Sequence, residues 1–230
     1  QQYQQRQAAA QSIEGELKKV LKSASDADDW IASSLRVIFG TDDTFRTEDR
    51  NRHPGGGRNF ETSWIELQLT GVVAALRLHG WNDAADLLKH YLDNTGEPVT
   101  VDVDRMLNDI PQFRKDVDTT LAGVRNQPDG NFQTNWMTSA PNLDDGGNNA
   151  NWYYAVNHFQ YRLVGHKNGG QIDYQVEVQK RYDWGVPSEH RRDLDRTPVH
   201  LEQADLARLN MVGEATDFDV KGQSGTKTTR

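Results

Sequence analysis

The stretch QIDYQVEVQKRYD, residues 171–183, alternates between apolar and polar side chains along most of its length. One face carries Ile172, Tyr174, Val176 and Val178, and the other carries Asp173, Gln175, Glu177 and Gln179. A period of two with β-branched and aromatic residues on one side predicts a strand that lies with one face against a core. The Asn168-Gly169 pair before it is a strong hairpin signal, so we expect an antiparallel partner upstream.

That partner falls in NWYYAVNHFQYRLVG, residues 151–165. The apolar positions alternate and then change parity, in the order Trp152, Tyr154, Val156, Phe159, Tyr161 and Leu163. Such a change predicts a β-bulge at Asn157-His158 within one long strand. Further along we expect a helix over residues 200–213 that ends at Gly213, a short strand over 217–222 and a disordered tail over 223–230.

The sequence before residue 125 has the apolar spacing of helices. Residues 63–81 predict a strongly apolar helix, and residues 85–92 predict its antiparallel partner after a turn at Gly80. Residues 102–124 predict one or two further helices, with Pro111 tolerated near a helix start and Asp104 as a helix N-cap. Two more helices are expected before residue 40, followed by a breaker segment over 50–58.

These patterns predict an α+β protein with a helical N-terminal part, followed by a small antiparallel β-sheet with one covering helix. The expected division is a helical subdomain over residues 1–125, a turn-rich connection over 126–150 and a β/α subdomain over 151–222. A chain of 230 residues is long enough to bury a sizeable core.

Composition excludes several classes of function. The net charge of −8 gives no basic footprint for nucleic acid or for an anionic membrane surface. The absence of cysteine excludes disulfides, thiolate metal sites and a cysteine nucleophile. No apolar run reaches the roughly 20 residues that a membrane-spanning helix needs. Because the first residue is Gln1, we expect a fragment or processed product whose targeting segment lies outside this sequence.

The segment RYDWGVPSEHRRDLD, residues 181–195, is the best candidate for a chemical site. Strand alternation places Lys180 and Tyr182 on the apolar face and Asp183 on the other, and we expect Lys180 to reach solvent or a carboxylate. A loop after Asp183 could bring back His190 and Arg191. A carboxylate, an imidazole and a guanidinium together can act on a phosphoester. The alternative is a charged surface loop with local Asp–Arg pairs that include Asp193 and Asp195.

Other motifs have simpler explanations. The glycines of HPGGGR, residues 53–58, lack the ending of a phosphate loop. The aspartates between residues 102 and 109 do not follow the pattern of an EF-hand. Residues 144–147, DDGG, could bind a cation, but a turn is enough to explain them. His79 and His90 fit ordinary helical positions, and His158 remains an outside candidate.

Two resemblances follow from longer patterns. Residues 85–224, through LDNTGEPVTVDVDRML, NWYYAVNHFQYRLVG, RYDWG and LEQADLARLNMVGEATDFDVKGQS, resemble actinobacterial proteins linked to type VII secretion, toxin-like polymorphic proteins among them. Within that group the chain looks most like conserved mycobacterial proteins of unassigned activity. This resemblance implies a secreted or envelope-associated bacterial protein with a secretion or immunity-type partner.

The second resemblance is to colicin-M-type bacteriocins, which cleave lipid II between undecaprenol and pyrophosphate. Their signature is Asp-x-Tyr-Asp, five residues, then His-Arg, with a divalent cation such as Mg²⁺ required. Tyr182-Asp183 and His190-Arg191 match its two pairs, while the first Asp falls on Lys180 and six residues separate Asp183 from His190. The resemblance implies that Asp183 positions water or metal, His190 transfers a proton, Arg191 binds phosphate and Tyr182 supports them. The rival interpretation is a non-enzymatic interaction module that descends from such a domain and binds a secretion or envelope partner.

Overall fold

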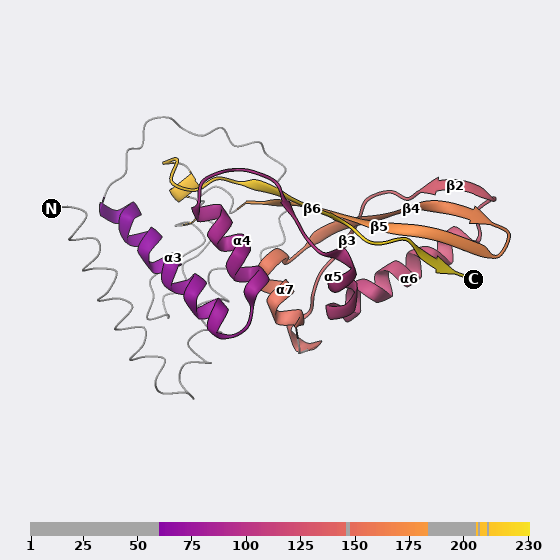
Figure 1. Cartoon of the computed structure of the whole chain (residues 1–230), viewed down its shortest axis with the longest axis horizontal. Coiled ribbons are helices and arrows are strands. Elements are labelled where there is room, and N and C mark those ends of the chain that lie inside the picture. Colours follow the sequence, from indigo (N-terminus) through magenta and orange to yellow (C-terminus); the bar gives the residue numbers. More distant parts are fainter. Residues whose placement is uncertain (1–59, 146–147, 184–205, 207, 211) are drawn as a thin grey trace, which may run out of the picture. The chain divides into compact units, whose positions relative to one another are not determined.

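The computed structural model describes residues 60–145, 148–183, 206, 208–210 and 212–230, and these fall into two compact units. One unit contains the described residues up to Thr95 and those from Asp183 to Asp217. The other contains Gly96–Tyr182 and Phe218–Arg230. The α+β class expected from the sequence is confirmed, with helices followed by a sheet (Figure 1).

The first unit is built on a helical hairpin. Helices α3 (Phe60–Leu78) and α4 (Asn82–Leu92) are joined at Gly80, whose φ of +76° suits a residue without Cβ. Both helices bury an apolar face, through Ile65, Leu69, Val72, Leu76, Leu87 and Leu88. The hairpin predicted from apolar spacing is therefore confirmed. No helix among the described residues is long and apolar enough to cross a membrane.

Residues near 210 belong to this first unit. Residues 206 and 208–210 are helical, and the backbone turns at Gly213 with a φ of +78°. The Tyr91 hydroxyl donates to the Leu206 carbonyl at 2.9 Å, and the Asn94 amide donates to the Gly213 carbonyl at 2.7 Å. The described residues of the helix expected over 200–213 thus contact the end of α4 and the residues after it, in the unit that does not contain the sheet.

The second unit is a seven-stranded sheet with short helices. Its strands are β1 (Val99–Thr100), β2 (Gly130–Gln133), β3 (Met137–Ser139), β4 (Phe159–Asn168), β5 (Gln171–Tyr182), β6 (Phe218–Gln223) and β7 (Lys227–Thr229). The order is β1-β6-β5-β4-β2, with β3 also on β4 and β7 also on β5. All pairings are antiparallel except β1 with β6.

The β4–β5 hairpin is the longest pairing and confirms the expected strand. Its register runs from Gln160↔Gln179 to Asn168↔Gln171, with Gly169 and Gly170 in the turn. The apolar residues of β5 are buried at Ile172, Tyr174, Val176 and Val178, as the alternation predicts.

Helices α5 (Val103–Asp109) and α6 (Pro111–Arg125) contact this sheet (Figure 1). Pro111 stands in the first turn of α6, where its missing N–H is not needed. Phe113 of α6 meets Phe159 and Tyr161 of β4 edge-on, at centroid distances of 4.8 and 5.4 Å. The helices that cover the sheet therefore come from between β1 and β2, and not from residues 200–213 as the sequence predicted.

Three sequence expectations are wrong in this unit. Residues 149–156 form helix α7 (Asn149–Val156), not the first part of a bulged strand. The helix buries Trp152, Ala155 and Val156 at spacings of three and four residues. Asp102, rather than Asp104, caps α5, because its side chain accepts from the Arg105 N–H at 2.9 Å. The tail from residue 223 is not disordered but continues into β7, which pairs with β5.

Candidate functional site

The carboxyl end of β5 carries the described part of the candidate site. Tyr182 is the last residue of the strand and lies in register with Phe218, the first residue of β6. The two rings stack with centroids 4.7 Å apart and planes 19° apart, and only 3% of Tyr182 is exposed. Burial raises the pKa of the Tyr182 hydroxyl far above its ordinary value, so the hydroxyl keeps its proton.

Lys180 lies on the same face of β5 as Tyr182, as strand alternation predicts. Its ammonium donates to the backbone carbonyl of His158 at 2.9 Å. The sequence predicts that this lysine reaches solvent or a carboxylate. The backbone carbonyl could not be predicted as its partner, because the turn between α7 and β4 positions that carbonyl. The lysine therefore ties the strand end to that turn.

The α7–β4 turn is shaped by Asn157. This residue has a φ of +46°, a conformation that asparagine tolerates better than most non-glycine residues. Its N–H donates to the Tyr153 carbonyl at 2.9 Å and ends the helix, and the following residue presents its carbonyl to Lys180. His158 thus meets the strand end through its backbone oxygen.

The opposite face of the same strand end carries surface ion pairs. The Arg181 guanidinium lies 3.1 Å from a carboxylate oxygen of Asp219, and the Lys221 ammonium lies 3.8 Å from the other oxygen. All three side chains are more than 40% exposed. Exposed pairs of this kind contribute at most about 1 kcal/mol, so they do not hold the strand end in place.

Asp183 follows Tyr182 directly and is half-buried. The backbone leaves the sheet at this residue, since β5 ends at Tyr182. His190 and Arg191 lie outside the described residues, as do Asp193 and Asp195. The structure thus places Tyr182 at the end of β5, directly before Asp183. The roles of all four candidate residues stay predictions.

The described residues do not form a cation site by themselves. In the part of the chain that the structure describes, no three histidine or carboxylate side chains cluster closely enough to hold a metal ion. Asp183 is the one carboxylate of the candidate motif in that part. A cation at this site would need further ligands from outside the described residues.

The remaining acidic and histidine candidates have structural contacts. The Asp109 carboxylate accepts from the Trp152 indole N–H at 2.9 Å, and Asp104 binds the C-terminal tail. The Asp144 N–H donates to the Asn142 side chain at 3.2 Å, in a turn of the expected kind. In the first unit, the His79 ring stacks on Trp81 with centroids 4.8 Å apart.

Sequence reasoning missed two of these contacts for different reasons. The Arg105 guanidinium lies over the Trp152 ring, 4.9 Å from its centroid, and the Asp109 carboxylate accepts from the Trp152 indole N–H. The i, i+4 spacing of Arg105 and Asp109 could have indicated that both side chains lie on one face of the helix. The contact of Asp104 with Gly225 and Lys227 joins residues more than 120 positions apart, and no local pattern announces it.

Comparison with known proteins yields a few distant structural likenesses. No protein-family model matches the chain, and no curated protein matches it. The chain is similar to the truncated bacteriocin syringacin M from Pseudomonas syringae pv. tomato DC3000, with a TM-score of 0.34 and 18% identity over 65% of this chain and 60% of that one. It is also similar to the bacteriocin syringacin M of the same organism, with a TM-score of 0.31 and 16% identity over 67% and 52% of the two chains.

A point mutant of syringacin M gives a TM-score of 0.30 with 19% identity over 64% of this chain and 51% of the other. This chain therefore spans between half and three fifths of the bacteriocin chains that it resembles. Likeness at such TM-scores transfers no residue roles to this chain.

Proposed function

We propose that this chain is a toxin-like effector domain that hydrolyses a phosphoester bond in a lipid-linked cell-wall precursor. The observation that carries the proposal is the fixed end of β5. Tyr182 is locked in the core by its stack on Phe218, and the ammonium of Lys180 anchors the same strand face. The chain therefore leaves the sheet at Asp183, immediately before the segment that contains the His190-Arg191 pair.

The proposed reaction uses four side chains. The Asp183 carboxylate orients a water molecule and takes up its proton as the oxygen bonds to phosphorus. His190 donates a proton to the prenyl oxygen as the phosphorus–oxygen bond breaks, so a prenol and a pyrophosphate product leave. Arg191 binds the phosphate oxygens in a bidentate manner and balances their charge. Tyr182, whose hydroxyl keeps its proton, has the supporting role that the motif resemblance implies.

A divalent cation such as Mg²⁺, which the motif resemblance implies, would neutralise phosphate charge when bound. Among the described residues, Asp183 is the single carboxylate of the motif that could bind such a cation. The assay therefore includes one arm with Mg²⁺ and one arm with a chelator.

The test is turnover of lipid II and of a short prenyl pyrophosphate by the full chain. We expect release of the prenol from the wild-type chain, and loss of at least about a hundredfold in Asp183→Ala and His190→Ala. Asp219→Ala is the matched control, since it removes a carboxylate from the neighbouring strand whose partners among the described residues are the exposed Arg181 and Lys221. Equal turnover in Asp183→Ala and in Asp219→Ala would rule out the assigned roles.

The second candidate is a non-enzymatic interaction module, and Lys180 favours it. This lysine occupies the position of the first aspartate of the motif, and its ammonium is bound to the His158 carbonyl. Under this alternative the full chain turns over neither substrate with or without Mg²⁺, and it captures a specific secretion or envelope partner. Substrate turnover by the wild-type chain excludes this alternative as the full account.

Export completes the proposal. A toxin-like domain that acts on a cell-wall precursor would be secreted or envelope-associated, and an immunity-type protein would protect the producing cell. The type VII route is a prediction from the resemblance over residues 85–224. Fractionation of the native host, with the chain followed in medium, envelope and cytoplasm, tests both the location and the route.

A further inference from the structure

The C-terminal strand is held by unusual means. Residues 224–230, SGTKTTR, contain no apolar side chain, yet β7 pairs with β5 in the register Tyr174↔Lys227, Asp173↔Thr228 and Ile172↔Thr229. Most strands of a sheet are retained by burial of apolar side chains. This segment instead depends on hydrogen bonds and charges.

Asp104 of α5 supplies the first of these bonds. One of its carboxylate oxygens accepts from the Gly225 N–H at 2.8 Å, and the other accepts from the Lys227 ammonium at 2.6 Å. These two bonds lower the pKa of the Asp104 carboxyl, the Gly225 N–H more than the lysine. The contact joins the start of β7 to a helix at the opposite end of this unit's sequence.

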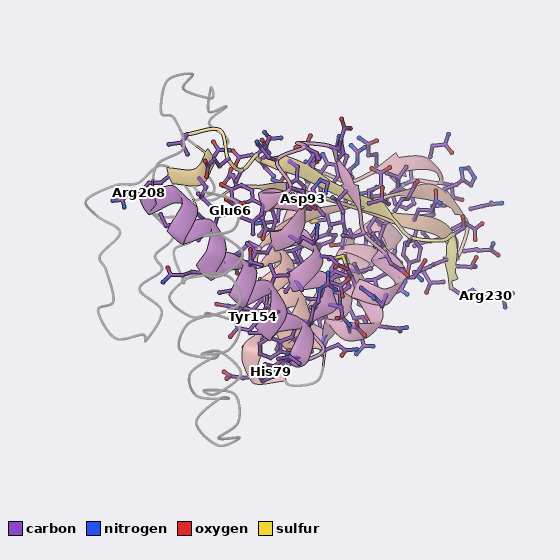
Figure 2. All side chains as sticks on the ribbon, turned by 60° about the vertical axis from the view of Figure 1, so that its left-hand side comes forward. Glu66, His79, Asp93, Tyr154, Arg208 and Arg230 are labelled. Atoms are coloured by element: carbon purple, nitrogen blue, oxygen red, sulfur yellow. The ribbon has the colours of Figure 1, made fainter. Side chains whose placement is uncertain are left out.

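Asp173 of β5 supplies the second. Its carboxylate accepts from the Thr228 hydroxyl at 2.6 Å, and this bond and those from Gln171 lower the pKa of the carboxyl. The Arg125 guanidinium of α6 donates to the Thr229 hydroxyl at 3.2 Å and to the Arg230 carbonyl at 3.3 Å. Figure 2 shows Arg230 at the free end of the ribbon beyond β7.

Ser224 marks where firm attachment ends. It is 3% exposed, its N–H donates to the Val176 carbonyl, and its hydroxyl oxygen accepts from the Val176 N–H, both at 2.9 Å. The backbone N–H and C=O groups of Val176 point toward Ser224. Because these groups alternate in direction along a strand, the N–H groups of Tyr174 and Ile172 point the same way, toward β7. The N–H groups of Asp173 and Gln175 point toward β4 instead.

We propose that residues 225–230 form a strap that detaches from the edge of β5 while the rest of the sheet stays folded. The carboxylates of Asp104 and Asp173 hold this strap in place. Opening exposes the backbone N–H and C=O groups of Ile172 and Tyr174 along this edge. The device is independent of the proposed reaction, because it lies at the hairpin end of β5 and the candidate motif lies at the other end.

Charged groups from neighbouring elements surround Asp104, Asp173 and the paired strand. Lys227 on β7 faces Asp104 and also Tyr174, and His166 on β4 faces Asp173. Asp118 on α6 acts on Tyr174, and Arg125 reaches the end of the strap. Folding lowers the pKa of these two carboxyls, so each stabilises the attached strap when the pH is above the ordinary pKa of 3.8. This contribution is lost as the pH falls through the lowered pKa.

Amide hydrogen exchange of the full chain at pH 7, resolved by residue, tests the strap. We expect the N–H groups of Ile172 and Tyr174 to exchange about tenfold faster in Asp104→Asn and in Asp173→Asn, and faster still in the double variant. After correction for the intrinsic exchange rates of the variant sequences, the N–H groups at positions 173 and 175 should keep their wild-type protection. Asp219→Asn, which removes the same charge from β6, should leave all four rates unchanged.

Two results would overturn the proposal. One is an unchanged exchange rate at Ile172 and Tyr174 in the double variant. The other is equal acceleration at Asp173 and Gln175, which would mean that the whole hairpin opens.

Discussion

Tyr182 and Phe218 stack with ring centroids 4.7 Å apart at the last register position shared by β5 and β6. Both residues are buried, whereas the charged neighbours Arg181 and Asp219 form only an exposed pair. The point at which the chain leaves the sheet is therefore set by an aromatic contact. That contact fixes the end of the strand that Asp183 follows.

Substitutions of Tyr182 separate its ring from its hydroxyl. Tyr182→Ala removes the ring from the stack and should lower the free energy of unfolding by about 3–5 kcal/mol. Tyr182→Phe keeps the ring and should stay within about 1 kcal/mol of the wild type. Urea unfolding followed by tryptophan fluorescence measures both. If Tyr182→Phe keeps its stability and loses prenol release, the hydroxyl supports the reaction; full release from that variant would remove Tyr182 from the proposed site.

High pH should destabilise the sheet unit. Burial raises the pKa values of Tyr161, Tyr174 and Tyr182 above their ordinary value of 10.0. The folded state then holds protons that the unfolded state releases, so stability is complete below pH 10 and falls as the pH rises above it. Urea midpoints measured between pH 8 and pH 11 should decrease above pH 10, and less steeply in Tyr182→Phe. Parallel curves for the two proteins would contradict a buried Tyr182.

Lys180 should contribute to stability through its ammonium. Lys180→Met keeps a long apolar side chain but removes the donor to the His158 carbonyl, and we expect a loss of about 1–2 kcal/mol. Lys221→Met is the matched control, because Lys221 is 61% exposed and should change stability by less than about 0.5 kcal/mol. Equal unfolding midpoints for the two variants would show that the contact of Lys180 with the His158 carbonyl does not contribute to stability.

Gly222 should resist any larger residue. A Cβ at this position would lie 2.5 Å from the Val101 carbonyl oxygen and 2.7 Å from a Val103 methyl, where the chain leaves β1 and enters α5. Gly222→Ala should therefore cost about 2 kcal/mol or more in thermal unfolding. Gly170→Ala in the β4–β5 turn meets no atom within 4 Å and should be close to neutral. A neutral Gly222→Ala would mean that β1 does not pass this close to β6.

The elements that could be predicted are those whose pattern is local. The alternation of β5, the hairpin turn before it and the position of Pro111 at a helix start follow from neighbouring residues. Helix α7 was mistaken for a strand because Trp152 and Val156 fit both periods over so short a segment. Strand β7 was mistaken for a disordered tail because its attachment depends on Asp104, far away in the sequence.

The candidate site divides in a similar way. Strand parity placed Lys180 and Tyr182 on the core face correctly, since one clean strand decides both. The partner of the lysine could not be inferred, because the carbonyl of His158 is presented by a turn with a positive φ at Asn157. The roles of His190 and Arg191 rest on the motif, and their placement relative to Asp183 remains a prediction.

The measurement that bears most directly on the proposed function is the release of undecaprenol from purified lipid II by the full chain. The reaction is run with Mg²⁺ and with a chelator, and the products are separated by chromatography. The account predicts release by the wild-type chain, loss of release in Asp183→Ala and in His190→Ala, and retention in Asp219→Ala. No release by the wild-type chain in either condition, or undiminished release by Asp183→Ala, would contradict it.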